Sequence, residues 1–195
     1  MLRRTALLLL LLFIPQAASG QIFLSGGAAA PLSPDPVTDI YRSGYSVALG
    51  FILESGAYPF VRLRPFGSFQ KFRTDPGPFR NQFENFDEVE GGAMPVIFAG
   101  ADLQFRRPFA DFTPFVAPAL GLAVFSIDDI TADGITINLQ DERTGLAVGI
   151  GGGFAYRLTR NYGLFLEAQA VYTILDGADR TFVPVRFGVE LSFDA

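Results

Sequence analysis

Residues 183–193, close to the C-terminal end, alternate strictly between apolar residues and all others. The odd-numbered positions are Val, Val, Phe, Val, Leu and Phe, and the even-numbered ones are Pro, Arg, Gly, Glu and Ser. Because successive side chains of a strand point to opposite faces, this period of two predicts a β-strand with one apolar and one polar face. Such a strand fits either a soluble sheet packed on a core or a membrane-spanning sheet with its apolar face in lipid.

The rest of the chain repeats this pattern, with turn-forming residues between the repeats. The eight predicted strands are residues 22–30, 45–53, 59–72, 96–106, 114–127, 146–156, 164–174 and 183–193. Which face of the fifth strand points inward stays open, because both of its faces are apolar or small. Residues 135–139 are expected to extend the sixth strand.

The connections between these strands alternate in length. They are long after the first, third and fifth strands and short after the second, fourth and sixth, although the connection after the seventh is also short. Tight turns on one side and long loops on the other are typical of bacterial outer-membrane barrels.

The N-terminal segment looks like an export signal. Arg3 and Arg4 precede an apolar run over residues 6–14, and small residues follow Pro15. This arrangement predicts a signal peptide over residues 1–20, cleaved before Gln21, and a single barrel domain over residues 21–195. The apolar run is too short to favour a membrane anchor helix, which needs about 20 residues.

Composition excludes several classes of function. The chain has no histidine and no cysteine, which excludes Ser-His-Asp and Cys-His catalytic arrangements, metal sites built on histidine, and disulfides. Loss of Arg3 and Arg4 lowers the 15 basic residues to 13 against 20 acidic ones, a net charge of −7. An exported chain this acidic is a poor candidate for binding nucleic acid.

Charge placement decides between the soluble and the membrane interpretation. The apolar faces of the last three predicted strands carry no charge, and the opposite faces carry few charges, of both signs. A solvated surface would be richer in lysine and glutamate, whereas this chain has a single lysine, Lys71. The sequence therefore predicts an all-β fold: a closed, antiparallel, up-and-down transmembrane β-barrel of about eight strands.

In such a barrel the polar faces point inward, where groups of opposite sign can pair. The predicted interior network consists of Arg62, Arg64, Asp102, Gln104, Arg106, Arg157, Glu167, Gln169, Arg186 and Glu190. An eight-stranded barrel is narrow enough for side chains to fill, so a paired plug is favoured over an open pore.

The C-terminal strand resembles the terminal signal of Gram-negative outer-membrane barrels. That signal is polar-x-Gly-x-x-hydrophobic-x-aromatic, and Arg186, Gly188, Leu191 and Phe193 match it. Residues 113–121 are similar to the Pro-aromatic-Val-small strand of the small OmpA- and OmpX-like barrels. The resemblance implies an outer-membrane location, contact with outer-membrane lipid and lipopolysaccharide, assembly by the barrel-assembly machinery and a monomeric state.

Three functions stay open. The first is a non-enzymatic outer-membrane barrel with a structural or surface-interaction role through its long acidic loops. The second is a narrow porin-like channel for small or apolar solutes, and the third is a soluble exported lipocalin-like carrier. No cofactor or metal is expected, because the acidic loops lack an EF-hand spacing and are interpreted as solvated. Enzymes among small outer-membrane barrels rely, as families, on a catalytic histidine that this chain lacks.

Overall fold

The computed structural model describes residues 19–33, 40–55, 58–75, 89–132, 135–137, 142–175 and 179–194. Of the expected signal peptide, residues 1–18 lie outside this range, and Ser19 and Gly20 begin the first strand. Among the described residues, no helix has the length and apolar character needed to cross a bilayer.

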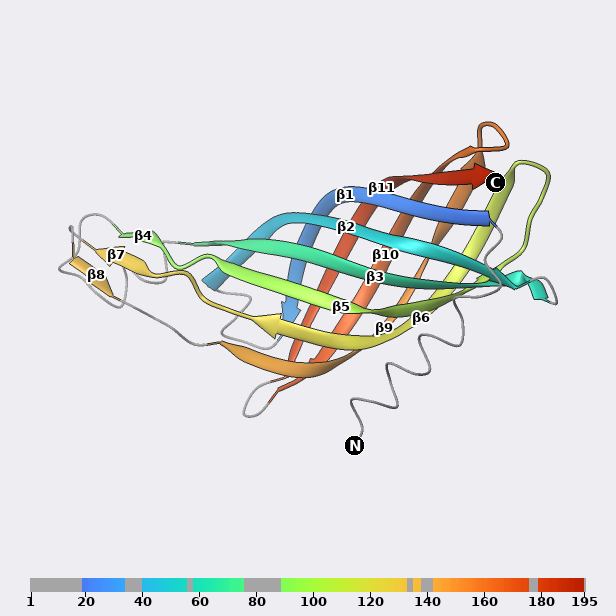
Figure 1. The fold of residues 1–195 in the computed structure, drawn as a ribbon. Coiled ribbons are helices and arrows are strands. Elements are labelled where there is room, and N and C mark those ends of the chain that lie inside the picture. Colours follow the sequence, from blue (N-terminus) through green and yellow to red (C-terminus); the bar gives the residue numbers. More distant parts are fainter. Residues whose placement is uncertain are drawn as a thin grey trace.

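Eight long antiparallel strands close into a barrel (Figure 1). They are β1 (Ser19–Ser33), β2 (Tyr41–Ser55), β3 (Tyr58–Thr74), β5 (Met94–Arg106), β6 (Phe112–Phe125), β9 (Arg143–Arg157), β10 (Tyr162–Ile174) and β11 (Arg180–Asp194). Around the barrel the order is β1, β11, β10, β9, β6, β5, β3, β2. Each strand therefore pairs with its neighbours in sequence, and the closing seam joins β1 to β11, from Ser19 opposite Asp194 to Ser33 opposite Thr181. The predicted fold class is confirmed.

The apolar faces of the strands point outward and their charged residues point inward, which is the reverse of a soluble barrel. Outward residues such as Phe51, Leu120 and Phe187 are 61%, 58% and 55% exposed, whereas charged inward residues such as Arg64 are buried. A soluble barrel would place the apolar set inside, so the lipocalin-like alternative is wrong. The outer surface is an apolar belt suited to lipid.

Seven of the eight predicted segments lie wholly within barrel strands, which are mostly longer than expected, and the fifth runs two residues past the end of β6 at Phe125. The structure settles the facing of β6, because Phe115, Ala117 and Ala119 point inward and Val116 and Leu120 point outward. Between the inward Phe115 and Phe125, the inward residues of β6 are small, and they leave space in the lumen.

One sequence expectation is wrong. Residues 135–137 do not extend β9, and residues 138–139 lie outside the described residues: β8 (Ile135–Ile137) pairs with β7 (Ile130–Ala132), and β7 also pairs with β4 (Val89–Gly91). This three-stranded sheet lies beyond the barrel end opposite to the C-terminal end of β11 (Figure 1). Gly91, which ends β4, and Gly92, which follows it, have φ of 89° and 67°, a backbone conformation that side-chain-bearing residues rarely adopt.

Candidate functional site

Four charged side chains meet in the middle of the barrel. Arg64 of β3 donates to Asp102 of β5 from Nε at 2.9 Å and from Nη2 at 2.8 Å. The same Nη2 donates to Glu167 Oε2 of β10 at 2.7 Å. The other Glu167 oxygen lies 2.7 Å from Nη2 of Arg186 on β11. Two positive and two negative groups from four strands thus form one chain of ion pairs, which we call the central network.

The surroundings of the central network are polar near its edges and aromatic above Arg64. Gln169 accepts from Arg186 at 3.1 Å, and Gln104, with its amide oxygen turned to Arg64, accepts from Arg64 Nε and Nη1 at 3.1 and 3.0 Å. The Arg64 guanidinium also lies 4.9 Å from the centroid of the Phe23 ring. These contacts spread the guanidinium charge over many partners in a buried environment, since Arg64 is 2% exposed.

Glycines on β9 make room for the long side chains of the network. In the β9–β10 register, Gly153 lies opposite Glu167 and Gly151 lies opposite Gln169. A Cβ at Gly151 would sit 3.2 Å from the Gln169 Cβ. The sequence predicts this division of space, since the inward face of residues 146–156 is almost bare backbone.

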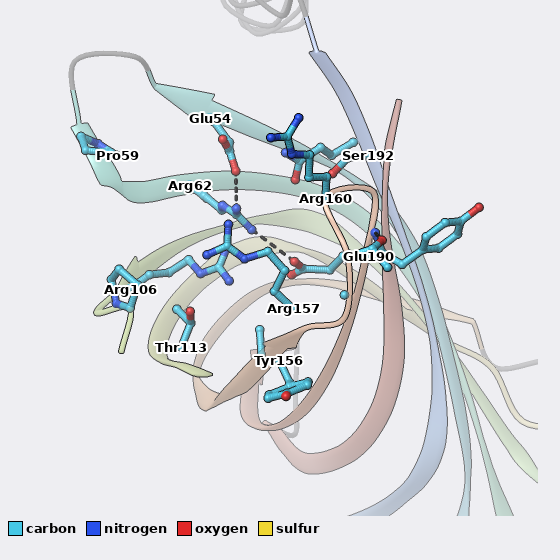
Figure 2. Close-up of a pocket in the computed structure, with 16 residues that line it drawn as sticks. Glu54, Pro59, Arg62, Arg106, Thr113, Tyr156, Arg157, Arg160, Glu190 and Ser192 are labelled. Carbon is cyan, nitrogen blue, oxygen red and sulfur yellow. Dashed lines mark hydrogen bonds and ion pairs between the residues drawn. The ribbon is translucent and has the colours of Figure 1, made fainter. Parts of the chain in front are cut away.

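A second set of charged side chains lines a pocket at the end of the barrel that carries the short turns, and we call this pocket the mouth (Figure 2). It is a pocket of about 330 Å³ at the ends of the strands. Arg62 bridges Glu190, at 3.2 Å, and Glu54 there. Arg106 and Arg157 also line the pocket. Arg157 has the inward position expected of it, but its side chain is 65% exposed because β9 ends there.

The structure therefore divides the ten predicted interior residues between two sites. Six lie in or against the central network: Arg64, Asp102, Gln104, Glu167, Gln169 and Arg186. The other four, Arg62, Arg106, Arg157 and Glu190, line the mouth.

Sequence reasoning missed an aromatic layer on the other side of the central network. Phe182 packs edge-on against Phe72 and Phe125, each with ring centroids 6.1 Å apart, and Met94, Val96 and Val171 are buried with them. The missed signal is parity: Phe72 continues the inward series of Ser68 and Gln70 on β3. The lumen is therefore filled by polar and apolar layers in turn.

The residues that match the terminal signal have different neighbours. Arg186 belongs to the central network, and Gly188 leaves space for a ring, since a Cβ there would sit 2.4 Å from Phe165 Cζ. Leu191 and Phe193 lie on the outer face, where Phe193 is 55% exposed. Two of the four residues thus have a packing reason for their identity.

The interior offers little to a reaction. Both carboxylates of the central network are bound by guanidinium groups, and the residues that the structure describes contain no cluster of three or more metal-ligating side chains. At the loop end, Asp128 is held by Lys71 at 2.7 Å. The acidic residues Glu84, Asp87 and Glu88 lie outside the described residues.

No protein-family model and no curated protein sequence matches the chain. Solved structures do share its fold. Neisserial surface protein A is similar with a TM-score of 0.59 at 13% identity, covering 90% of this chain and 97% of that one. A major outer membrane protein from Thermus thermophilus is similar with a TM-score of 0.57 at 13% identity, covering 89% and 99%. The chain has the fold of a small outer-membrane β-barrel, and at this level of identity the likeness is one of fold alone.

Proposed function

We propose that this chain is a non-enzymatic protein of the outer membrane, which acts at the cell surface through the connections at its long-loop end. The observation that carries the proposal is the inside-out barrel with a filled interior. A lumen filled by the central network and by the aromatic layer favours a rigid transmembrane support over an active site inside the barrel.

The long-loop end supplies the surface. The sheet of β4, β7 and β8 raises backbone beyond the barrel at that end, and the exposed carboxylates of Asp128 and Asp129 lie at its base. Loops held on a rigid support are the usual place for recognition. The proposed partners are outer-membrane lipid and lipopolysaccharide around the belt and the barrel-assembly machinery at the C-terminal strand, with the protein as a monomer.

The porin-like channel is disfavoured by the same packing. Phe72, Phe98, Phe165 and Phe182 are each no more than 2% exposed, and they occupy the layers through which a solute would have to pass. Steady unitary conductance steps in a planar bilayer would nevertheless overturn the proposal, because a filled interior cannot conduct.

Cell fractionation and surface proteolysis test the proposal together. The full chain, expressed in a Gram-negative host, should fractionate with the outer membrane. It should also run faster on an unboiled gel than after boiling, since a closed barrel resists detergent. Protease added to intact cells should cut at the long-loop end and spare the short turns. Cleavage at the turn between Arg157 and Tyr162 in intact cells would contradict the orientation, and recovery in the soluble fraction would contradict the location.

A further inference from the structure

The mouth has an excess of positive charge in an acidic protein. Its lining contains four arginines, Arg62, Arg106, Arg157 and Arg160, and two carboxylates, Glu54 and Glu190. The whole chain has a net charge of −5. The pocket is therefore a positive site on a negative molecule, and positive lining of a concave site focuses the potential on small anions.

The two carboxylates do not neutralise this excess. Both are engaged by one residue, Arg62, which contacts Glu54 and Glu190 (Figure 2). The nearest carboxylate to Arg157 is Asp111, at 4.0 Å from Nε. Within the described ranges, Arg106 and Arg160 have no ion pair, and the buried Nε of Arg106 has no hydrogen-bond partner.

The pocket is closed at its inner end. The next inward residues on β3 and β5 are Arg64 and Gln104, which are 2% and 1% exposed. The side chains of Arg62, Arg106 and Arg157 extend into the opening from three different strands (Figure 2). Guanidinium groups that converge on a blind, water-accessible pocket match the geometry of phosphate oxygens, because each guanidinium presents a fork of N–H donors.

We propose that the mouth is a binding site for a phosphate-bearing anion, held chiefly by Arg106, Arg157 and Arg160. Arg62 keeps its two glutamates and shapes the wall. The anion is either free in solution or the headgroup of a phospholipid at the same end of the barrel. The site lies at the opposite end from the loops and stands independently of the proposed surface role.

Calorimetric titration of the full chain in non-ionic detergent with pyrophosphate tests the proposal. Binding should saturate and weaken with added salt. The double variant Arg106→Gln with Arg160→Gln keeps a polar side chain at each position and removes two charges. It should lower the affinity by at least about tenfold, which is the factor expected when a single charged hydrogen bond is lost. Arg107→Gln is the matched control, because Arg107 is exposed on the same turn, outside the pocket lining, and stacks on Phe109.

A second measurement separates the two sources of phosphate. The protein is placed in phosphatidylcholine nanodiscs containing phosphatidylglycerol, and the lipid retained after release is identified by native mass spectrometry. Retention of phosphatidylglycerol that the double variant loses, without pyrophosphate binding, assigns a headgroup, and saturable pyrophosphate binding assigns a free anion.

The proposal is overturned if neither anion binds more tightly than about 1 mM, or if the double variant binds as the unmodified protein does. Every variant is first checked for the faster mobility of a folded barrel on an unboiled gel, so that loss of binding is not loss of fold.

Discussion

Glu167 links the two halves of the central network, so its neutralisation is a sharp test of a dry, charge-balanced interior. Its carboxylate lies 2.7 Å from Arg64 Nη2 and 2.7 Å from Arg186 Nη2, and it is 4% exposed. In Glu167→Gln, two buried guanidinium groups keep only Asp102 as a counter-ion. Leaving a buried charge uncompensated typically costs about 3–5 kcal/mol.

Urea unfolding of the barrel in lipid vesicles measures this cost. With a slope of about 3 kcal/mol per molar urea, the unfolding midpoint should fall by about 1 M or more. The chain has no tryptophan, so unfolding is followed by circular dichroism and by mobility on unboiled gels. Glu54→Gln is the control: this carboxylate is 41% exposed at the mouth, and its loss should cost no more than about 1 kcal/mol.

A double variant identifies the cause. Glu167→Gln combined with Arg186→Gln removes one charge of each sign and leaves the pair of Arg64 and Asp102 intact. The combined loss should be smaller than the sum of the single losses by about 1–3 kcal/mol. If Glu167→Gln unfolds at the same urea concentration as the unmodified protein, the interior is wet and the argument from buried charge fails.

Three further predictions concern the belt, a packed glycine and a turn. Val185→Arg places a charge near the middle of the apolar belt on β11 and should destabilise the barrel in lipid by about 2–4 kcal/mol. Phe193→Arg, at the end of the same strand, should cost about 1 kcal/mol or less. Equal losses in vesicle unfolding would mean that Val185 does not face the bilayer core. Gly188→Ala sets a methyl group 2.4 Å from Phe165 Cζ and 2.6 Å from the Leu24 carbonyl oxygen, and it should cost about 1–3 kcal/mol in the same assay. Phe165→Leu in the same chain should recover the part of that loss that comes from the ring, and fully additive losses would show that the ring does not contribute to it. Ala110 has φ of 53° in the turn closed by Phe109 and Phe112, so Ala110→Gly should raise the unfolding free energy by about 1 kcal/mol, and a loss of stability would show that the turn does not hold that conformation.

The sequence predicts the barrel well because the period of two is a local property. Most barrel strands show from their own residues which face points inward, as in β3, where Arg62 and Arg64 alternate with Val61 and Leu63. From the sequence, β6 is ambiguous because its inward residues, such as Ala117, are small, and a small side chain fits either face. Only its partners β5 and β9 decide which way it points.

The pairings inside the barrel could not be predicted, because they depend on register. Glu167 meets Arg186 because the β10–β11 register places the two residues opposite each other. It meets Arg64 because β3 and β10 face each other across the lumen, and no local pattern encodes that distance. The same holds for the sheet of β4, β7 and β8, where segments separated by the whole of β5 and β6 pair with each other. The period of two along β3 and β11 predicts that Phe72 and Phe182 point inward, but it does not predict that their rings are in contact.

The seam between β1 and β11 sets a condition on biogenesis. The seam pairs the first barrel strand with the last, for example Gln21 opposite Ser192, so the closing hydrogen-bonded ladder needs β1 and β11 at the same time. Until the final segment has emerged, any partial sheet keeps two open edges whose free N–H and C=O groups can capture a foreign strand. Closure is therefore necessarily a late event, and contacts this distant in sequence are slow to form. A chain that lacked one of the eight strands would keep two unpaired edges, so it would be prone to pair with other strands instead of closing into a smaller barrel.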